Sequence, residues 1–97
     1  MEVKPTPVGE LAVPMINING SSKPWMLQNY RTTLHTLDVL RLQLGQIAPH
    51  GRDYQTAPEG ALDLAMAQHR QRYEALTLMT QEIEYLAECV QKQEGGR

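Results

Sequence analysis

Apolar residues recur with helical spacing over two long stretches of the chain. In the first stretch they follow one another after three or four residues, which places them on one face of a helix. Either Ser21 or Ser22 can cap this helix, Pro24 fits its first turn, and Pro49 ends it. The pattern predicts a helix over about residues 22–47, with an apolar face of Met26, Tyr30, Leu37, Leu40, Leu44 and Ile47.

The second stretch predicts a longer helix, over about residues 57–93. Thr56 and Glu59 have the spacing of a capping box, in which two side chains satisfy free N–H groups at a helix start. At 1.5 Å per residue the helix would be roughly 50–55 Å long, so its last three turns would extend beyond the shorter helix. Its apolar face comprises Leu62, Met66, Tyr73, Leu76, Ile83, Ala87 and Val90.

The segment before the helices has a different pattern. Pro5, Pro7 and Pro14 favour extended backbone, so we expect residues 1–14 to form an extended arm, disordered in part. Ile16 and Ile18 alternate with asparagines, which is the period of a strand. Because no second strand is evident in the chain, this strand either pairs with its copy in another subunit or lies along a helix.

The fold class that follows is all-α: a long antiparallel helical hairpin over residues 15–97, preceded by the arm. The second helix also carries an apolar stripe almost opposite the first, which one partner helix cannot cover. Either the arm covers this stripe within one chain, or the chain forms a homo-oligomer through it. The predicted oligomer interface is Leu64, Leu78, Tyr85 and Cys89, with Ala67 on the same side.

Composition limits the function. A net charge of −2 is unlike that of a nucleic-acid-binding domain, which is usually basic. The single cysteine excludes an intrachain disulfide and a paired-cysteine zinc site. No apolar run approaches the length of a membrane span, and the N-terminus lacks the apolar region of a signal peptide. We therefore expect a cytoplasmic protein that contacts neither membrane nor nucleic acid.

Two short segments carry side chains suited to ligand binding. Arg52 offers a planar guanidinium for a phosphate, Tyr54 can stack on a base, and His50 adds charge at lower pH. Asn17 and Asn19 carry amides that can bind a base or a ribose. The alternative for the first segment is a well-formed interhelical turn, and for the second a strand edge with its turn.

Metal binding and catalysis have little support in the sequence. A hairpin whose turn centres near residue 52 would place His35 near His69, but no helix carries a paired histidine or Glu–His motif. Cys89 follows Glu88, which does not favour a thiolate. Motifs of hydrolases, nucleotide triphosphatases and dinucleotide-binding enzymes are also missing from the sequence. We expect a non-enzyme without a metal or cofactor.

The segments ININGSS and PHGRDY, followed by a helix carrying AQHRQR, resemble a type of small protein found in phages and prophages. The resemblance runs from about Val13 to Ala87 and implies a phage origin, with the host cytoplasm as location. Some small phage proteins are oligomeric helical anti-defence factors that sequester nucleotide immune signals, as anti-CBASS and anti-Thoeris sponges do. No binding motif of those sponges is matched residue by residue.

These observations predict a binding protein that holds an anionic, nucleotide-like ligand between subunits, using Asn17, Asn19, Arg52 and Tyr54. One alternative is an inhibitor that contacts a host protein through apolar faces and an acidic C-terminal end. Another is a structural adaptor of a virion or replication complex.

Overall fold

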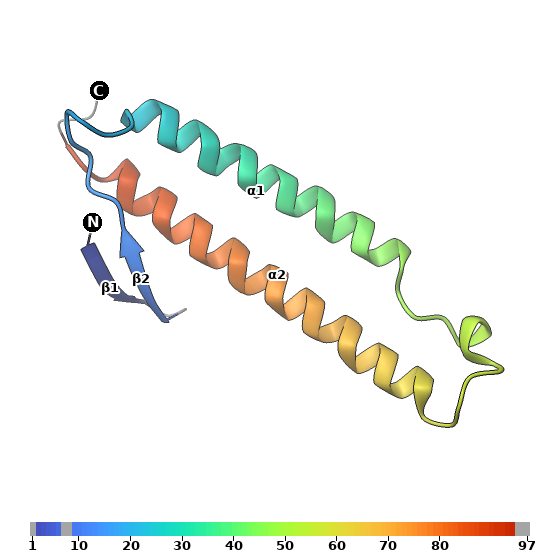
Figure 1. Ribbon diagram of the computed structural model, residues 1–97. Coiled ribbons are helices and arrows are strands. Elements are labelled where there is room, and N and C mark those ends of the chain that lie inside the picture. The colour runs from blue at the N-terminus through green and yellow to red at the C-terminus, as the bar shows by residue number, and fades with distance from the viewer. Residues whose placement is uncertain (1, 7–8, 95–97) are drawn as a thin grey trace.

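A computed structural model describes residues 2–6 and 9–94, which form a helical hairpin with a small β-hairpin beside one end (Figure 1). The elements in chain order are β1 (Glu2–Thr6), β2 (Gly9–Val13), α1 (Lys23–Gln46), a 3-10 turn (Gly51–Tyr54) and α2 (Ala61–Gln91). The two helices run antiparallel and side by side over most of their length (Figure 1). The predicted helical hairpin is thus confirmed, and the molecule measures about 61 × 25 × 18 Å.

Helix α1 begins and ends within one residue of the predicted bounds. The Ser22 hydroxyl accepts a hydrogen bond from the Trp25 N–H at 3.3 Å. Of the two candidate serines, Ser22 is therefore the one that caps the helix. Pro24 occupies the first turn, where its missing N–H removes no helical hydrogen bond.

Helix α2 begins four residues later than predicted, and the Thr56–Glu59 capping box does not cap it. Gly60 precedes the helix with a φ of 85°, a left-handed conformation that favours glycine. The preceding residues form turns instead, in which the Ala57 N–H donates to the Tyr54 carbonyl and the Ala61 N–H to the Pro58 carbonyl. The chain therefore changes direction at Gly60, directly before the helix.

The late start of α2 changes which residues face each other. Arg41 Nη2 donates to the Thr77 hydroxyl at 2.9 Å, and Lys23 Nζ donates to the Gln93 carbonyl at 2.8 Å. The turn thus centres near residue 59, so the expected proximity of His35 and His69 is wrong. The first turns of α2, and not the last, extend beyond α1 and lie beside the connector (Figure 1).

The core between the helices is small and aliphatic. It consists of Leu37, Leu44 and Leu76, against which Leu34, Tyr73 and Ile83 pack. The Tyr73 hydroxyl lies close to Gly45, where an added Cβ would be 3.3 Å from it, so a glycine is suited to this contact. Many large apolar side chains of the described residues remain exposed, which is unusual for a domain that must be stable alone.

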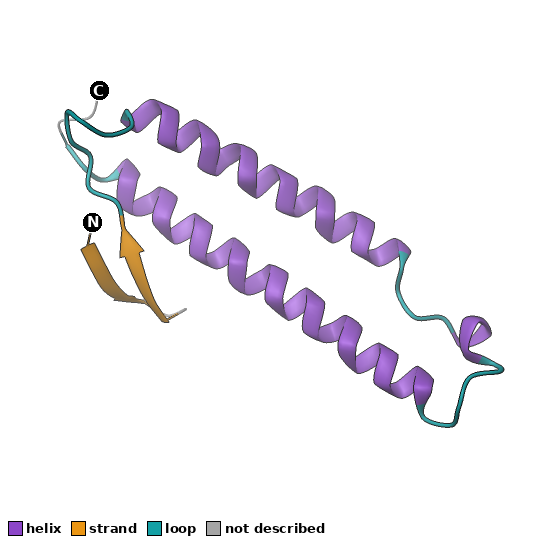
Figure 2. Ribbon diagram, in the orientation of Figure 1, coloured by secondary structure: helices purple, strands orange, loops and turns teal. Residues whose placement is uncertain are grey.

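Within the expected N-terminal arm, residues 2–6 and 9–13 form two paired strands, which we call the β-hairpin (Figure 2), and residues 1, 7 and 8 lie outside the described part of the chain. β1 and β2 pair antiparallel, with Glu2 opposite Val13 and Thr6 opposite Gly9. Pro5, opposite Glu10, is compatible with this pairing because a two-stranded sheet consists of edge strands only.

The strand expected near residues 15–20 does not form. The Asn19 N–H donates to Asn17 Oδ1 at 3.0 Å, and the Gly20 N–H donates to the Asn17 carbonyl at 3.2 Å. This local turn satisfies backbone groups that a strand would pair with a neighbour, so the alternation of Ile16 and Ile18 does not produce a strand.

β2 packs on the C-terminal half of α2, on the side away from α1 (Figure 1). Val13 and Val90 are fully buried. The amide of Gln93 bonds the incoming chain twice, accepting from the Ile16 N–H and donating to the Pro14 carbonyl, both at 2.7 Å. We call these two hydrogen bonds the Gln93 clasp.

Gln93→Ala is expected to lower the free energy of unfolding by about 1–3 kcal/mol, because it leaves two half-buried backbone groups without their partners. Hydrogen exchange of the amides in residues 9–16 should accelerate, whereas Gln91→Ala, at an exposed position of the same helix, should leave it unchanged. Equal exchange in both variants would contradict the role of the clasp.

Candidate functional site

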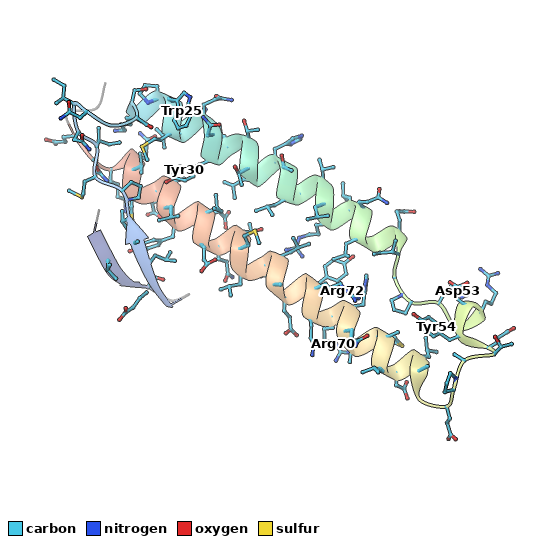
Figure 3. All side chains as sticks on the ribbon, viewed as in Figure 1. Trp25, Tyr30, Asp53, Tyr54, Arg70 and Arg72 are labelled. Atoms are coloured by element: carbon cyan, nitrogen blue, oxygen red, sulfur yellow. The ribbon has the colours of Figure 1, made fainter. Side chains whose placement is uncertain are left out.

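The two segments with predicted binding residues lie at opposite ends of the helical hairpin. Asn17 and Asn19 precede α1, whereas Arg52 and Tyr54 follow it in the connector. Figure 3 labels Tyr54 at the connector end of the molecule. Helix α1 has 24 residues and so separates them by roughly 36 Å. A single chain therefore does not bring these side chains together.

The His50–Tyr54 segment is an ordered turn. His50 Nδ1 accepts from the Arg52 N–H at 3.2 Å, and the His50 carbonyl accepts from the Asp53 N–H at 2.9 Å. His50 thus caps the 3-10 turn. The Arg52 side chain is exposed and Tyr54 is half-buried, which leaves the guanidinium accessible to an anion.

The Asn17 amide is engaged within its own turn. Besides accepting from Asn19, it donates through Nδ2 to the Met15 carbonyl at 3.1 Å. Asn17 and Asn19 are both exposed. The hydrogen bonds of Asn17 form the turn of the alternative considered for this segment, but no strand edge accompanies it.

A pocket that the sequence analysis did not anticipate lies where α1 passes into the connector. It has a volume of about 330 Å³ and is lined by Ala48, Pro49, Met66, His69, Arg70 and Tyr73. We call it the His69 pocket. Such a volume lies at the lower end of the range typical of small-ligand sites.

His69 is the unusual member of this pocket. It is 8% exposed, and its ring meets that of Tyr73 edge to face, with centroids 5.0 Å apart. Within the described part of the chain, neither ring nitrogen has a hydrogen-bond partner, although both are buried. A buried polar group without a partner carries a desolvation cost, which a ligand group can offset.

Positive charge lies close to the pocket. Arg70 is exposed on its lining, and Arg41 places its guanidinium carbon 5.8 Å from the centre of the Tyr73 ring (Figure 3 shows Arg70 and Arg72 along α2). The pocket thus combines apolar walls with an imidazole, a phenol and a guanidinium. The first turns of α2, beyond the end of α1, bring these groups to the connector.

A second concavity, of about 290 Å³, lies between the helices. Its lining is apolar except for one arginine, and consists of Leu40, Leu44, Arg72, Ala75, Leu76 and Met79. It offers contact surface for another apolar side chain and few polar groups for a small ligand.

The residues predicted for an oligomer interface divide into two groups. Leu64 is 60% and Leu78 46% exposed, whereas Tyr85 and Cys89 are half-buried in the part of α2 where β2 packs. The N-terminal β-hairpin thus covers the end of this stripe and leaves its first half open.

Cys89 also lies near Tyr30 of α1. Partial burial, with nearby Cys89 as a smaller cause, raises the pKa of the Tyr30 hydroxyl.

The described residues contain no group of three or more His, Cys, Asp or Glu side chains able to hold a metal ion. In the same part of the chain, none of the helices has the length and apolar character needed to cross a membrane. Comparisons with protein-family models, curated proteins and solved structures found no match to this chain.

Proposed function

We propose that this protein is a non-enzymatic binding protein that sequesters a small anionic, nucleotide-like ligand. The observation that carries the proposal is the His69 pocket with its two buried ring nitrogens. Pro49, Met66 and Tyr73 offer flat or flexible apolar surface for a base. A small shift of the His69 ring would let it bond polar atoms of the base, and Arg70 would meet a phosphate.

The proposed site lies at the connector end of the molecule, away from Asn17 and Asn19. Arg52 belongs to the same connector as Ala48 and Pro49, so it is a further candidate for contact with the phosphate. Asn17 and Asn19 lie at the other end and would reach a ligand only from a neighbouring subunit. The resemblance to phage proteins supports an anti-defence role, in which the ligand is an immune signal in the host cytoplasm.

Arg70→Ala is expected to weaken binding of the ligand about ten- to a hundredfold, since a charge-assisted hydrogen bond contributes about 1.5–3 kcal/mol. Arg31→Ala, at an exposed position of α1, is the matched control and should bind as wild type does. Mass spectrometry of material released by heat identifies the ligand, and calorimetry with a panel of cyclic and linear nucleotides measures the affinities.

Wild-type protein that releases no small molecule and binds none of the panel would contradict the proposal. Binding that survives Arg70→Ala but is lost in Arg52→Ala would retain the function and place the phosphate at the 3-10 turn.

The apolar groove around Leu40 and Met79 favours a second candidate function, contact with a host or virion protein. Such a partner would insert an apolar side chain between the helices. Leu40→Asp and Met79→Asp would then abolish co-purification of that partner in stoichiometric amount while nucleotide binding stays unchanged.

A further inference from the structure

The first half of α2 carries an exposed stripe on the side opposite the core. Its members recur every three or four residues and comprise Leu64, Ala67, Gln71, Ala75 and Leu78, of which only Ala67 is half-buried. Leu78 lies two residues, or about 200° around the helix, from the buried Leu76, so the stripe is centred on the side away from α1. Ala75 lies at its edge and also lines the concavity between the helices. We call it the outer stripe.

The uncovered length of this face is well defined. It starts at Ala61, where α2 begins, and continues to about residue 81, because Glu82, Tyr85 and Cys89 on the same side are half-buried. The midpoint of the uncovered length is Gln71. The uncovered length therefore accommodates a helix of about 21 residues, which is roughly 30 Å long.

The outer stripe is symmetric about Gln71. If a second copy of α2 is laid antiparallel on it with Gln71 at the two-fold axis, Leu64 faces Leu78 of the second copy. Ala67 faces Ala75 of the second copy in the same way, and these small side chains allow the helices to approach closely. The two Gln71 amides meet at the axis, where each can donate to the other and accept from it.

The same arrangement avoids the β-hairpin. Ala61 of the second copy would lie opposite Gln81, so the second helix begins where the uncovered length ends. The uncovered length of one copy thus matches the same length of another.

Charges flanking the outer stripe are complementary in this arrangement. Arg70 and Glu74, both exposed, lie on the same flank one helical turn apart. In the antiparallel pair, each Arg70 lies about 3 Å along the helix axis from Glu74 of the second copy, and the two Arg70 residues lie about as close to each other. Two attractive pairs therefore meet one repulsive pair. In a parallel pair, Arg70 would lie beside Arg70 and Glu74 beside Glu74, which is unfavourable.

We propose that the outer stripe binds a second copy of this chain, antiparallel and centred on Gln71. This goes beyond the proposed ligand binding and does not depend on it. Arg70 lines the His69 pocket as well, and the five N–H groups of a guanidinium allow it to bond Glu74 of the second copy and a ligand. The interface is isologous and closes as a dimer.

Sedimentation of the full chain measures the dimer. We expect wild-type protein to be dimeric at micromolar concentration, and Leu78→Glu to weaken the dimer at least a hundredfold with helicity retained in circular dichroism. Leu42→Glu, at an exposed position of α1, is the matched control and should dimerise as wild type does. Arg70→Glu and Glu74→Arg should each weaken the dimer about tenfold, and the double variant should restore it.

Cross-linking tests the register independently. In a Cys89→Ser background, oxidised Gln71→Cys should form an intermolecular disulfide because the two sulfurs meet at the axis. Gln81→Cys should not, since the antiparallel arrangement separates the two positions by roughly 30 Å. A strictly monomeric wild type, a Leu78→Glu dimer of unchanged affinity, or cross-linking of Gln81→Cys as efficient as that of Gln71→Cys would overturn the proposal.

Discussion

Replacing Leu37 by alanine is expected to lower the free energy of unfolding by about 2–5 kcal/mol. Leu37 is 7% exposed and packs with Leu44 and Leu76, which with it form the buried core between the helices. The hairpin consists of only two helices, so no further layer can move in to fill a cavity at this position. Since small domains have a total stability of similar size, the variant should be largely unfolded at moderate temperature.

Leu42→Ala is the matched control for this substitution. Leu42 belongs to the same helix and is 76% exposed, so its truncation should change the free energy of unfolding by no more than about 0.5 kcal/mol. Urea titration followed by circular dichroism, at equal protein concentrations, measures both variants. Equal losses would show that the side of α1 facing α2 is assigned incorrectly.

The second large effect is expected for Val90→Asp. Val90 is 0% exposed, so the new carboxylate would be buried near the C-terminal end of α2. A buried carboxylate without a partner should lower the free energy of unfolding by about 3–5 kcal/mol at neutral pH. Val39→Asp, at a position of α1 that is 52% exposed, should cost less than about 1 kcal/mol.

The effect of Val90→Asp should depend on pH with a defined sign. Burial raises the pKa of the introduced carboxyl above its unfolded value of about 3.9. The charge penalty is therefore fully present well above that folded pKa, and it disappears as the pH falls below about 3.9. Thermal unfolding from pH 3 to pH 8 should show the difference from wild type growing with pH, and a difference that is constant would contradict the burial of this position.

The helices could be predicted because their signals are local. The apolar spacing, the serine cap and Pro24 determine α1 within a few residues of the chain, and its bounds were accurate. The start of α2 was not, because the capping-box pattern of Thr56 and Glu59 is equally compatible with turns. The left-handed conformation of Gly60 favours turns over a helix start at Thr56, and the φ of a glycine cannot be predicted from the sequence.

The His69 pocket was missed for the same reason. Facing residues of a hairpin follow from where the turn centres, so a shift of seven residues at the turn moves His69 from the middle of α1 to Pro49. Its neighbours Met66 and Tyr73 were visible only as members of an apolar stripe. A binding pocket formed across a turn depends on the length of the connector, which sequence spacing alone determines poorly.

The β-hairpin shows a different limit. Prolines and a short apolar segment at positions 2–13 resemble an extended arm, and pairing becomes evident only when β2 has α2 to pack against. The alternation of Ile16 and Ile18 was a stronger strand signal, but the side chain of Asn17 forms a turn there. Long-range packing and local side-chain bonding each outweighed the period of the residues.

The Gln93 clasp also has a consequence for dynamics. Its two hydrogen bonds link Gln93 to Ile16 and to Pro14, which are 77 and 79 residues away in sequence. Because neither bond joins α1 to α2, the clasp can open while the two helices stay paired. Cys89, the single thiol of the chain, is half-buried about one helical turn before Gln93, so we expect opening to increase the exposure of this thiol. The rate at which a thiol reagent modifies native protein therefore reports how often the N-terminal segment detaches, and no label needs to be introduced.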